Sequence, residues 1–124
     1  MHTDIISFPS QQEGWGNQFL EAVKAELPIV VFEYDVYKAD IKAAGFNTIS
    51  LGSKIEGYDE TGLATLPSHV LNGAAMKTIR FLQDLEYRER IVTHNYKIGF
   101  EKFSFNALMQ YIKPILENLK ENSY

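Results

Sequence analysis

The 124-residue sequence contains no cysteine, which excludes disulfide bonds and zinc sites built on thiolates. A chain without cysteine is natural in a reducing compartment, so we expect a cytoplasmic protein. Basic residues are also few, because 12 lysines and arginines stand against 16 aspartates and glutamates and the formal net charge is −4. The sequence therefore has no basic footprint for nucleic acid, and we expect no nucleic-acid partner.

Long apolar runs are absent as well. No segment approaches the roughly 20 apolar residues of a membrane-spanning helix, and no signal peptide is visible at the N-terminus. His2, His69 and His94 lack the spacing of metal ligands, so we expect neither a metal ion nor a cofactor. Hydrophobic residues make up 45% and charged residues 23% of the chain, which is ordinary for a globular protein. The length predicts one domain over residues 1–124.

Short apolar strands alternate with helical segments in the first half of the chain. The second of the predicted strands is rich in β-branched residues and has the pattern of a strand buried on both faces. Residues 34–46, between the second and third strands, are expected to be irregular with one short helix. Residues 52–62, after the third strand, are expected to form an exposed loop. The predicted strands are Ile5–Phe8, Ile29–Phe32 and Asn47–Leu51, and a helix runs from about Asn17 to Ala25 with Phe19, Leu20 and Val23 on one face.

Everything after Pro67 is predicted to be helical. Ser68 is a suitable N-cap for a first helix, a second helix carries residues 87–100, and Ser104 is a suitable cap for a third, which Pro114 is expected to kink or interrupt. Strands linked by helices predict the α/β class, with a small three-stranded parallel sheet and flanking helices. The apolar stripes of the first and third helices are Leu71, Ala75, Ile79 and Leu82, and Leu108, Ile112, Ile115 and Leu119.

The segment "PSQQEGWGNQFLEA", residues 9–22, joins the first strand to the first helix. Gly14 and Gly16 allow the backbone to turn sharply and to approach a ligand closely, so one of them is predicted to adopt a conformation unfavourable for other residues. Asn17 is a favourable helix cap. The free amides of the first helical turn would then lie at the carboxyl end of the strands, where open α/β sheets bind ligands and where a helix attracts anions.

Two glutamates of this segment, Glu13 and Glu21, are eight positions apart. At about 1.5 Å per residue they would be on the order of 12 Å apart in a continuous helix. This exceeds the roughly 5–10 Å between the carboxylates of hydrolytic glycosidases, which argues against a shared acid–base pair. Two hydroxyl-bearing ends of a long ligand, with phosphates between them at the helix tip, fit the spacing better. Glu33 lies at the end of the second strand, and the sequence leaves two roles for it: it lines a ribose or base pocket, or it has a structural role.

The segment "FPSQQEGWGNQFLEAV" resembles the E-x7-E motif of the retaining glycosyltransferases with the GT-B fold, glycosyl transferases group 1 or family 4. The similarity continues through "PIVVFEYDVYKADI", "GLATLPSHVLNGAAMKTIRFLQD" and "RERIVTHNYKIGFEKFSFNAL". The resemblance implies that Glu13 is a catalytic residue that contacts hydroxyls of the donor sugar, and that Glu21 holds the ribose hydroxyls of the nucleotide. It further implies that backbone amides contact the sugar and the diphosphate at Trp15, Gly16, Asn17 and Gln18.

The same resemblance implies the second half of a Rossmann-like, nucleotide-sugar-binding GT-B domain. The complete enzyme would transfer a hexose from a nucleoside diphosphate sugar to a hydroxyl acceptor, which is a glycan, a lipid or a small molecule. In that family the acceptor domain and a basic Arg/Lys clamp lie upstream, so we expect a fragment or a truncated reading frame that binds nucleotides weakly. The alternative is a non-catalytic α/β binding or interaction module that retains the motif by descent.

The first strand has an unguarded edge. If it is the fourth strand of a doubly wound sheet, its natural neighbour is missing. Its unpaired backbone groups would then invite pairing with another chain. We therefore expect a two-fold homodimer that buries Ile5, Ile6 and Phe8.

Overall fold

The computed structural model describes residues 3–121, and the expectation for His2 lies outside this range. Three short strands form a parallel sheet in the order β1–β2–β3. The prediction of an α/β fold with a three-stranded parallel sheet is therefore confirmed, and the arrangement is consistent with a Rossmann-like fold. The strands are β1 (Ile6–Phe8), β2 (Ile29–Val31) and β3 (Ile49–Ser50).

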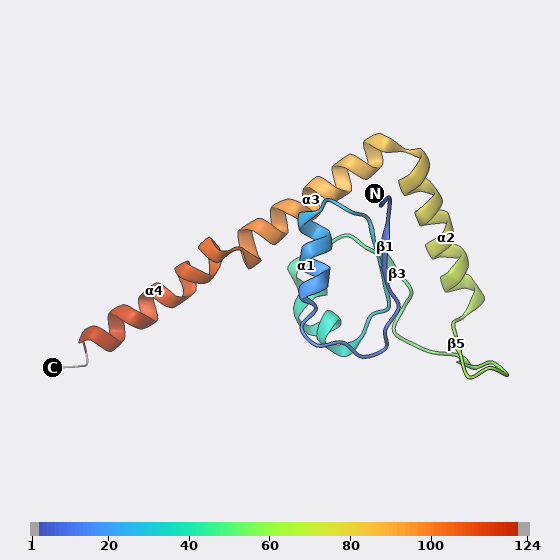
Figure 1. Ribbon diagram of the computed structural model, residues 1–124, viewed down its shortest axis with the longest axis horizontal. Coiled ribbons are helices and arrows are strands. Elements are labelled where there is room, and N and C mark those ends of the chain that lie inside the picture. Colours follow the sequence, from blue (N-terminus) through green and yellow to red (C-terminus); the bar gives the residue numbers. More distant parts are fainter. Residues whose placement is uncertain (1–2, 122–124) are drawn as a thin grey trace.

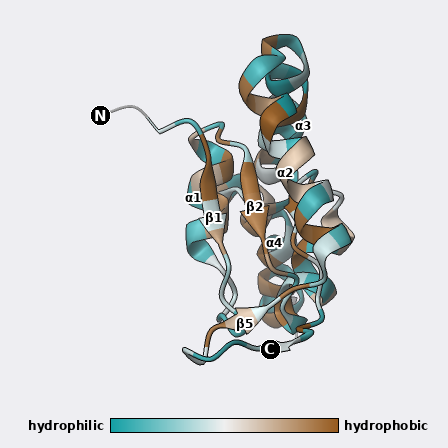
Figure 2. Ribbon diagram, turned by 90° about the vertical axis from the view of Figure 1, so that its right-hand side faces the viewer, coloured by the Kyte–Doolittle hydropathy of each residue, from teal (hydrophilic) through white to brown (hydrophobic). Residues whose placement is uncertain are grey.

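The alternation of side chains along β2 divides the interior into two cores. Ile29 and Val31 point to one face of the sheet, where α1 (Asn17–Lys24) packs, and Val30 points to the other. Both β1 and β2 are strongly hydrophobic in Figure 2. Because β2 is the central strand and both of its faces are covered, its sequence is a continuous apolar run, as predicted.

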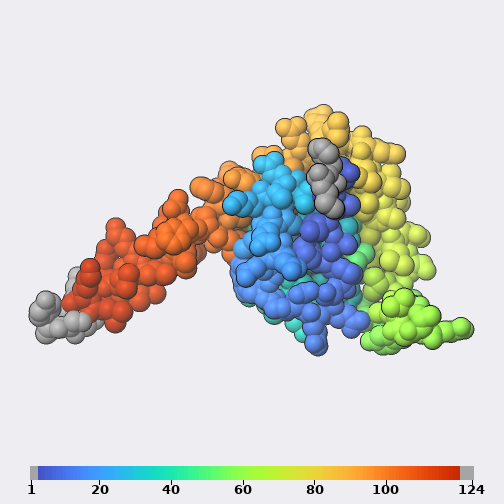
Figure 3. All heavy atoms as spheres, viewed as in Figure 1, coloured from blue at the N-terminus to red at the C-terminus, as the bar shows by residue number. Residues whose placement is uncertain are grey.

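Three long helices complete the structure (Figure 1). The helix α2 (Ser68–Gln83) covers β3 on the face opposite α1, and α3 (Leu85–Phe103) packs against both α1 and α2. The last helix, α4 (Phe105–Glu121), continues away from the sheet as an arm, which is clear in the space-filling view (Figure 3). No helix within residues 3–121 is long and apolar enough to cross a membrane.

Residues 35–44, where one short helix was expected, are helical throughout. They include a π-helical turn, η1 (Tyr37–Ile41), and a 3₁₀ turn, η2 (Lys42–Ala44). Both Tyr37 and Ile41 are buried in the core beneath α1, which explains why this short segment is ordered.

The start of β3 is held by one buried side chain of α3. The amide nitrogen of Asn95 donates to the carbonyl of Asn47 at 2.9 Å, and its oxygen accepts from the Asn47 backbone N–H at 2.7 Å. The same helix contacts the preceding turn, because Lys102 donates to the Ala44 carbonyl at 3.0 Å and His94 lies 3.1 Å from the Gly45 carbonyl. The helix α3 therefore fixes the chain between η2 and β3.

The segment predicted as an exposed loop contains more structure than expected. Its second half contains β4 (Gly57–Tyr58), which forms an antiparallel hairpin with β5 (Ala64–Thr65), just beyond the predicted loop. A carboxylate oxygen of Asp59 accepts from the backbone N–H groups of Thr61 and Leu63 and from the Thr61 hydroxyl. The sequence pattern missed the hairpin because each strand has only two residues and neither is buried.

The predicted helix caps had mixed outcomes. Ser104 caps α4, since its hydroxyl accepts from the backbone N–H of Ala107 at 3.2 Å. Ser68 was wrong as a cap, because Pro67 occupies that position and Ser68 is the first helical residue. The helix α4 runs through Pro114 without interruption.

The apolar stripes of α2 and α4 predict helices correctly, but they do not face the core. In α2 the buried residues are Ala74 and Phe81, while Leu71, Ile79 and Leu82 of the stripe are exposed. The stripe of α4 is mostly exposed as well, with Ile112 half-buried. A three-stranded sheet is narrow. It covers only one face of α2, and α4 extends beyond its edge, so the apolar stripes of both helices stay mostly exposed.

Candidate functional site

The first turn of α1 begins at the carboxyl end of β1. Gly16 is the N-cap residue and has a left-handed backbone, with φ of 81°. The prediction that Gly14 or Gly16 would adopt a conformation unfavourable for other residues is confirmed at Gly16, and Gly14 has no positive φ. Asn17 was wrong as a cap, because the left-handed turn places Gly16 in that position and Asn17 becomes the first helical residue.

A cavity of about 270 Å³ opens in front of this turn. It lies where β1 and β2 end, which is where parallel sheets with helical crossovers bind ligands. The first amides of a helix have no intrahelical partner and carry partial positive charge, so this wall of the cavity favours an anion. Five of the six residues selected from the sequence line it, namely Glu13, Trp15, Gly16, Asn17 and Gln18.

The sixth residue, Glu21, lies on a different side of α1. It lines a groove of about 450 Å³ between α1 and the junction of α3 with α4, together with Phe100 and Phe103. The structure therefore places the two glutamates of the motif at separate cavities. Glu13 precedes α1, whereas Glu21 lies one turn inside the helix, where α3 packs against α1 and forms the other wall of the groove.

Trp15 fastens the loop before α1 to the rest of the molecule. Its ring packs against Phe103 of α3 with 5.2 Å between ring centroids, and the side chain is 40% exposed. The indole therefore has a packing role at the entry to α1, while part of its surface stays exposed.

Tyr34 is a cavity residue that sequence reasoning missed. It is 5% exposed, and its hydroxyl would lie 2.8 Å from a Cβ atom placed on Gly16. Burial, followed by the nearby charges of Glu13 and Tyr37, raises the pKa of the Tyr34 phenol above its ordinary value. The available signal was its position two residues beyond the apolar run of β2, at the carboxyl end of a parallel strand.

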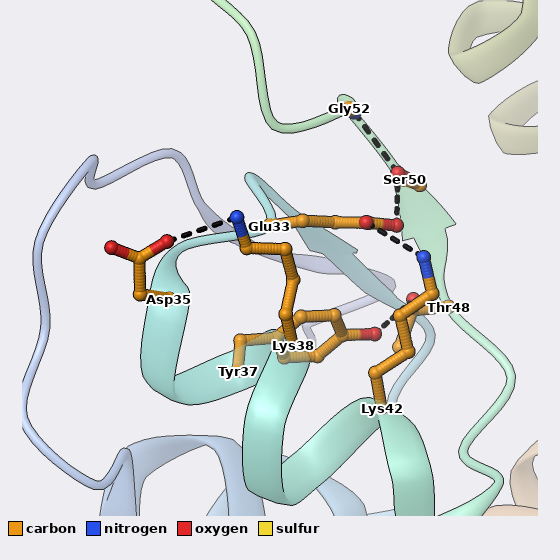
Figure 4. Close-up of polar contacts among 8 residues, drawn as sticks. All are labelled: Glu33, Asp35, Tyr37, Lys38, Lys42, Thr48, Ser50 and Gly52. Atoms are coloured by element: carbon orange, nitrogen blue, oxygen red, sulfur yellow. Dashed lines mark hydrogen bonds and ion pairs between the residues drawn. The ribbon is translucent and has the colours of Figure 1, made fainter.

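Glu33 does not line this cavity and instead joins three segments of the fold (Figure 4). One carboxylate oxygen accepts from the Lys42 ammonium at 2.7 Å and the other from the Ser50 hydroxyl at 2.7 Å. Burial would raise the pKa of Glu33, but the hydrogen bonds from Lys42 and Ser50 and the charges of Lys42 and Lys38 outweigh it and lower that pKa. Of the two roles left open by the sequence, these contacts favour the structural one.

The cavity as a whole offers neutral donors and one carboxylate. The amides at the tip of α1 suit an anionic group, and Glu13 suits hydroxyls, which can donate to its carboxylate. Within residues 3–121, no cluster of three or more histidine, aspartate or glutamate side chains could hold a metal ion.

Comparison with known proteins finds similarity to two curated relatives. The chain is 41% identical over 105 residues to a mannosylglucosylglycerate synthase of Thermotoga maritima, and the match covers 85% of this chain. It is 58% identical over 53 residues to a mannosylglucosylglycerate synthase of Petrotoga mobilis, a match that covers 43% of this chain and 12% of that protein. No protein-family model and no solved structure matches the chain.

The similarity concerns a part of a larger protein. The chain spans about a quarter of the length of the Thermotoga maritima relative, since the match covers 24% of that protein.

Proposed function

We propose that this chain is the nucleotide-sugar-binding part of a retaining glycosyltransferase with the GT-B fold. The complete enzyme transfers a hexose from a nucleoside diphosphate sugar to a hydroxyl acceptor. The observation that carries the proposal is the convergence of Glu13 with the backbone at 15–18 around one cavity at the tip of α1.

The similarity to known proteins supports the same conclusion. Both relatives bear the name of a glycosyltransferase. This favours a sugar-transferring enzyme over the alternative of a non-catalytic interaction module.

The geometry suggests how the parts of a donor would be distributed. The diphosphate would face the amides of Gly16, Asn17 and Gln18, where the partial charge of the helix N-terminus stabilises the charge that develops on the leaving group. The sugar would extend to Glu13, which accepts hydrogen bonds from its hydroxyls. A cavity of 270 Å³ is slightly smaller than the roughly 300–1,000 Å³ of small-molecule sites, so it fits part of such a ligand.

We also propose that Glu21 binds the ribose, although Glu21 does not line the cavity at the tip of α1. Its groove adjoins the same helix on the side facing α3. A nucleoside that leaves the cavity along α1 would meet this carboxylate, which could accept from both ribose hydroxyls.

Binding to the isolated chain tests the proposal. Amide NMR spectra of the labelled protein would be recorded during titration with UDP and GDP, each as the free diphosphate and as the glucose or mannose ester. We expect selective shifts at residues 15–18, with dissociation constants of about 1 mM, equivalent to about −4 kcal/mol. The affinity is weak because few charged groups contact the phosphates.

Two variants assign the glutamates. Glu13→Gln should weaken binding of the sugar esters more than that of the free diphosphates, whereas Glu21→Ala should weaken both while leaving inorganic pyrophosphate unaffected. Glu60→Gln in the exposed hairpin is the matched control and should change nothing. Absence of shifts at residues 15–18 with every ligand at 10-fold the expected constant would overturn the proposal and favour the interaction module.

A further inference from the structure

The hydroxyl of Tyr34 reaches the ligand cavity without a protein partner. Tyr34 is 95% buried, and its ring packs near that of Tyr37 with 5.9 Å between ring centroids. The residue also lines the cavity at the tip of α1. Every fully buried side-chain nitrogen or oxygen within residues 3–121 has a hydrogen-bond partner. The Tyr34 hydroxyl has none among these residues, so this oxygen is the part of the side chain that opens into the cavity.

The position of this hydroxyl relative to α1 is well defined. A Cβ atom on Gly16 would lie 2.8 Å from the Tyr34 oxygen, which places the hydroxyl directly against the N-cap. The amides of Asn17 and Gln18 follow immediately on the helix and line the same cavity. A ligand atom that accepts from the helix tip is therefore also within reach of the phenol.

The chemistry of a phenol suits this location. A neutral O–H can donate to an anion without introducing a cation, and it can sit beside Glu13, whose charge contributes to the raised pKa of the phenol. Because that pKa lies above its ordinary value, the hydroxyl keeps its proton at neutral pH. The hydroxyl faces the cavity without a protein partner, so its donor is available to a ligand, and a hydrogen bond to a charged acceptor is roughly twice as strong as one between neutral groups.

We propose that the Tyr34 hydroxyl donates a hydrogen bond to an anionic oxygen of the ligand bound at the N-terminus of α1. The inference rests on the proposed function, under which this oxygen belongs to the donor diphosphate. Tyr34 is then a ligand-binding residue that complements the backbone amides, and it adds one side-chain donor beside the Glu13 carboxylate.

The experiment uses inorganic pyrophosphate as the probe, because it has neither sugar nor base. The chain would be labelled uniformly with ¹³C and ¹⁵N, and the Tyr34 Cζ resonance would be assigned by through-bond correlation to its own backbone. Pyrophosphate should move the Tyr34 resonance together with the amides of Asn17 and Gln18. Tyr34→Phe should weaken pyrophosphate binding about tenfold or more, as expected for the loss of one hydrogen bond to a charged acceptor.

Tyr37→Phe is the matched control. It also removes a phenolic hydroxyl from the same segment, but that hydroxyl is bonded to Thr48 at 2.9 Å and does not line the cavity. It should lower stability and leave the affinity for pyrophosphate unchanged.

The outcomes separate the inference from the proposed function. Equal affinity of the wild type and Tyr34→Phe, with the α1 amides still shifting, would overturn the role of Tyr34 alone. No response of the α1 amides in the wild type would overturn both. If Tyr34→Phe failed to fold, the wild-type Cζ titration would decide, since an unmoved Tyr34 resonance at saturating pyrophosphate contradicts the hydrogen bond.

Discussion

Gly16 determines the shape of the candidate site at the scale of single residues. Its φ of 81° turns the chain into α1, and it leaves no room for a side chain beside the Tyr34 hydroxyl. Gly14, two residues earlier, has no positive φ, and a Cβ atom there would meet nothing within 4 Å. The two glycines of the motif therefore have different requirements, although they look alike in the sequence.

Gly16→Ala should reduce the free energy of unfolding by about 2 kcal/mol, since a left-handed alanine costs about 1–2 kcal/mol and the new methyl group must also displace the phenol. The same change should weaken nucleotide binding, because the methyl group narrows the cavity. Urea denaturation and the NMR titration described above measure the two effects. Gly14→Ala is the control, and a loss of stability there equal to that of Gly16→Ala would contradict this account.

At the scale of elements, Glu33 connects the end of β2 to its neighbours. Its backbone N–H donates to the Gly52 carbonyl at 2.8 Å, and the side chain binds Lys42 of η2 and Ser50 of β3. The Ser50 hydroxyl in turn accepts from the Gly52 backbone N–H at 2.9 Å (Figure 4). One carboxylate thus holds the carboxyl ends of two strands and the turn between them.

This arrangement predicts a pH dependence of stability. Because the folded state lowers the pKa of Glu33 below its ordinary value of 4.5, the stabilisation is present above that pH and is lost as the pH falls through the folded pKa. Glu33→Gln should cost about 1–2 kcal/mol at pH 7 and less at pH 3. Urea denaturation at both pH values, with Glu60→Gln as the control, measures the difference. A cost that is equal at the two pH values would show that the charge of Glu33 contributes nothing.

The whole molecule exposes more surface than a compact protein of its mass. Its accessible surface is 8911 Å², whereas a compact monomer of 14.2 kDa has about 6,800 Å². Part of the excess belongs to the α3–α4 arm (Figure 3), and β1 pairs with β2 along one edge only. The difference of about 2,100 Å² exceeds the roughly 800 Å² that each partner buries in a standard interface.

We propose that the chain forms a two-fold dimer in which the β1 edges of two copies pair, burying Ile5, Ile6 and Phe8. Ile6 donates to the Pro28 carbonyl, so the N–H of the next residue, Ser7, points toward the open edge. Sedimentation at low micromolar concentration should show a dimer for the wild type and for Ser7→Thr. Ser7→Pro removes the outward N–H and should give a folded monomer.

Urea denaturation establishes that Ser7→Pro is folded. A wild type that sediments as a monomer would exclude the dimer. If Ser7→Pro formed dimers as stable as those of the wild type, the interface would not be the β1 edge. The exposed face of α4 would then be the next surface to test.

Much of the fold and part of the site could be predicted from local patterns. The short apolar runs Ile5–Phe8 and Ile29–Phe32 predict strands, because side chains on both faces of a strand can be buried. The turn at Gly16 follows from the conformational freedom of glycine. These features depend only on residues that are close in the sequence, so the sequence alone determined them.

Tertiary packing decided what local patterns could not. Tyr34 meets Gly16, and Asn95 holds Asn47, across separations that no periodicity encodes. The stripes of α2 and α4 predict amphipathic helices, but the narrow sheet determines which of their faces is covered. Likewise the spacing of Glu13 and Glu21 was readable in the sequence, yet only the packing of α3 against α1 placed them at separate cavities. The sequence thus determined the elements and the candidate motif, and the tertiary structure decided which side chains share a surface, because burial depends on contacts between distant segments.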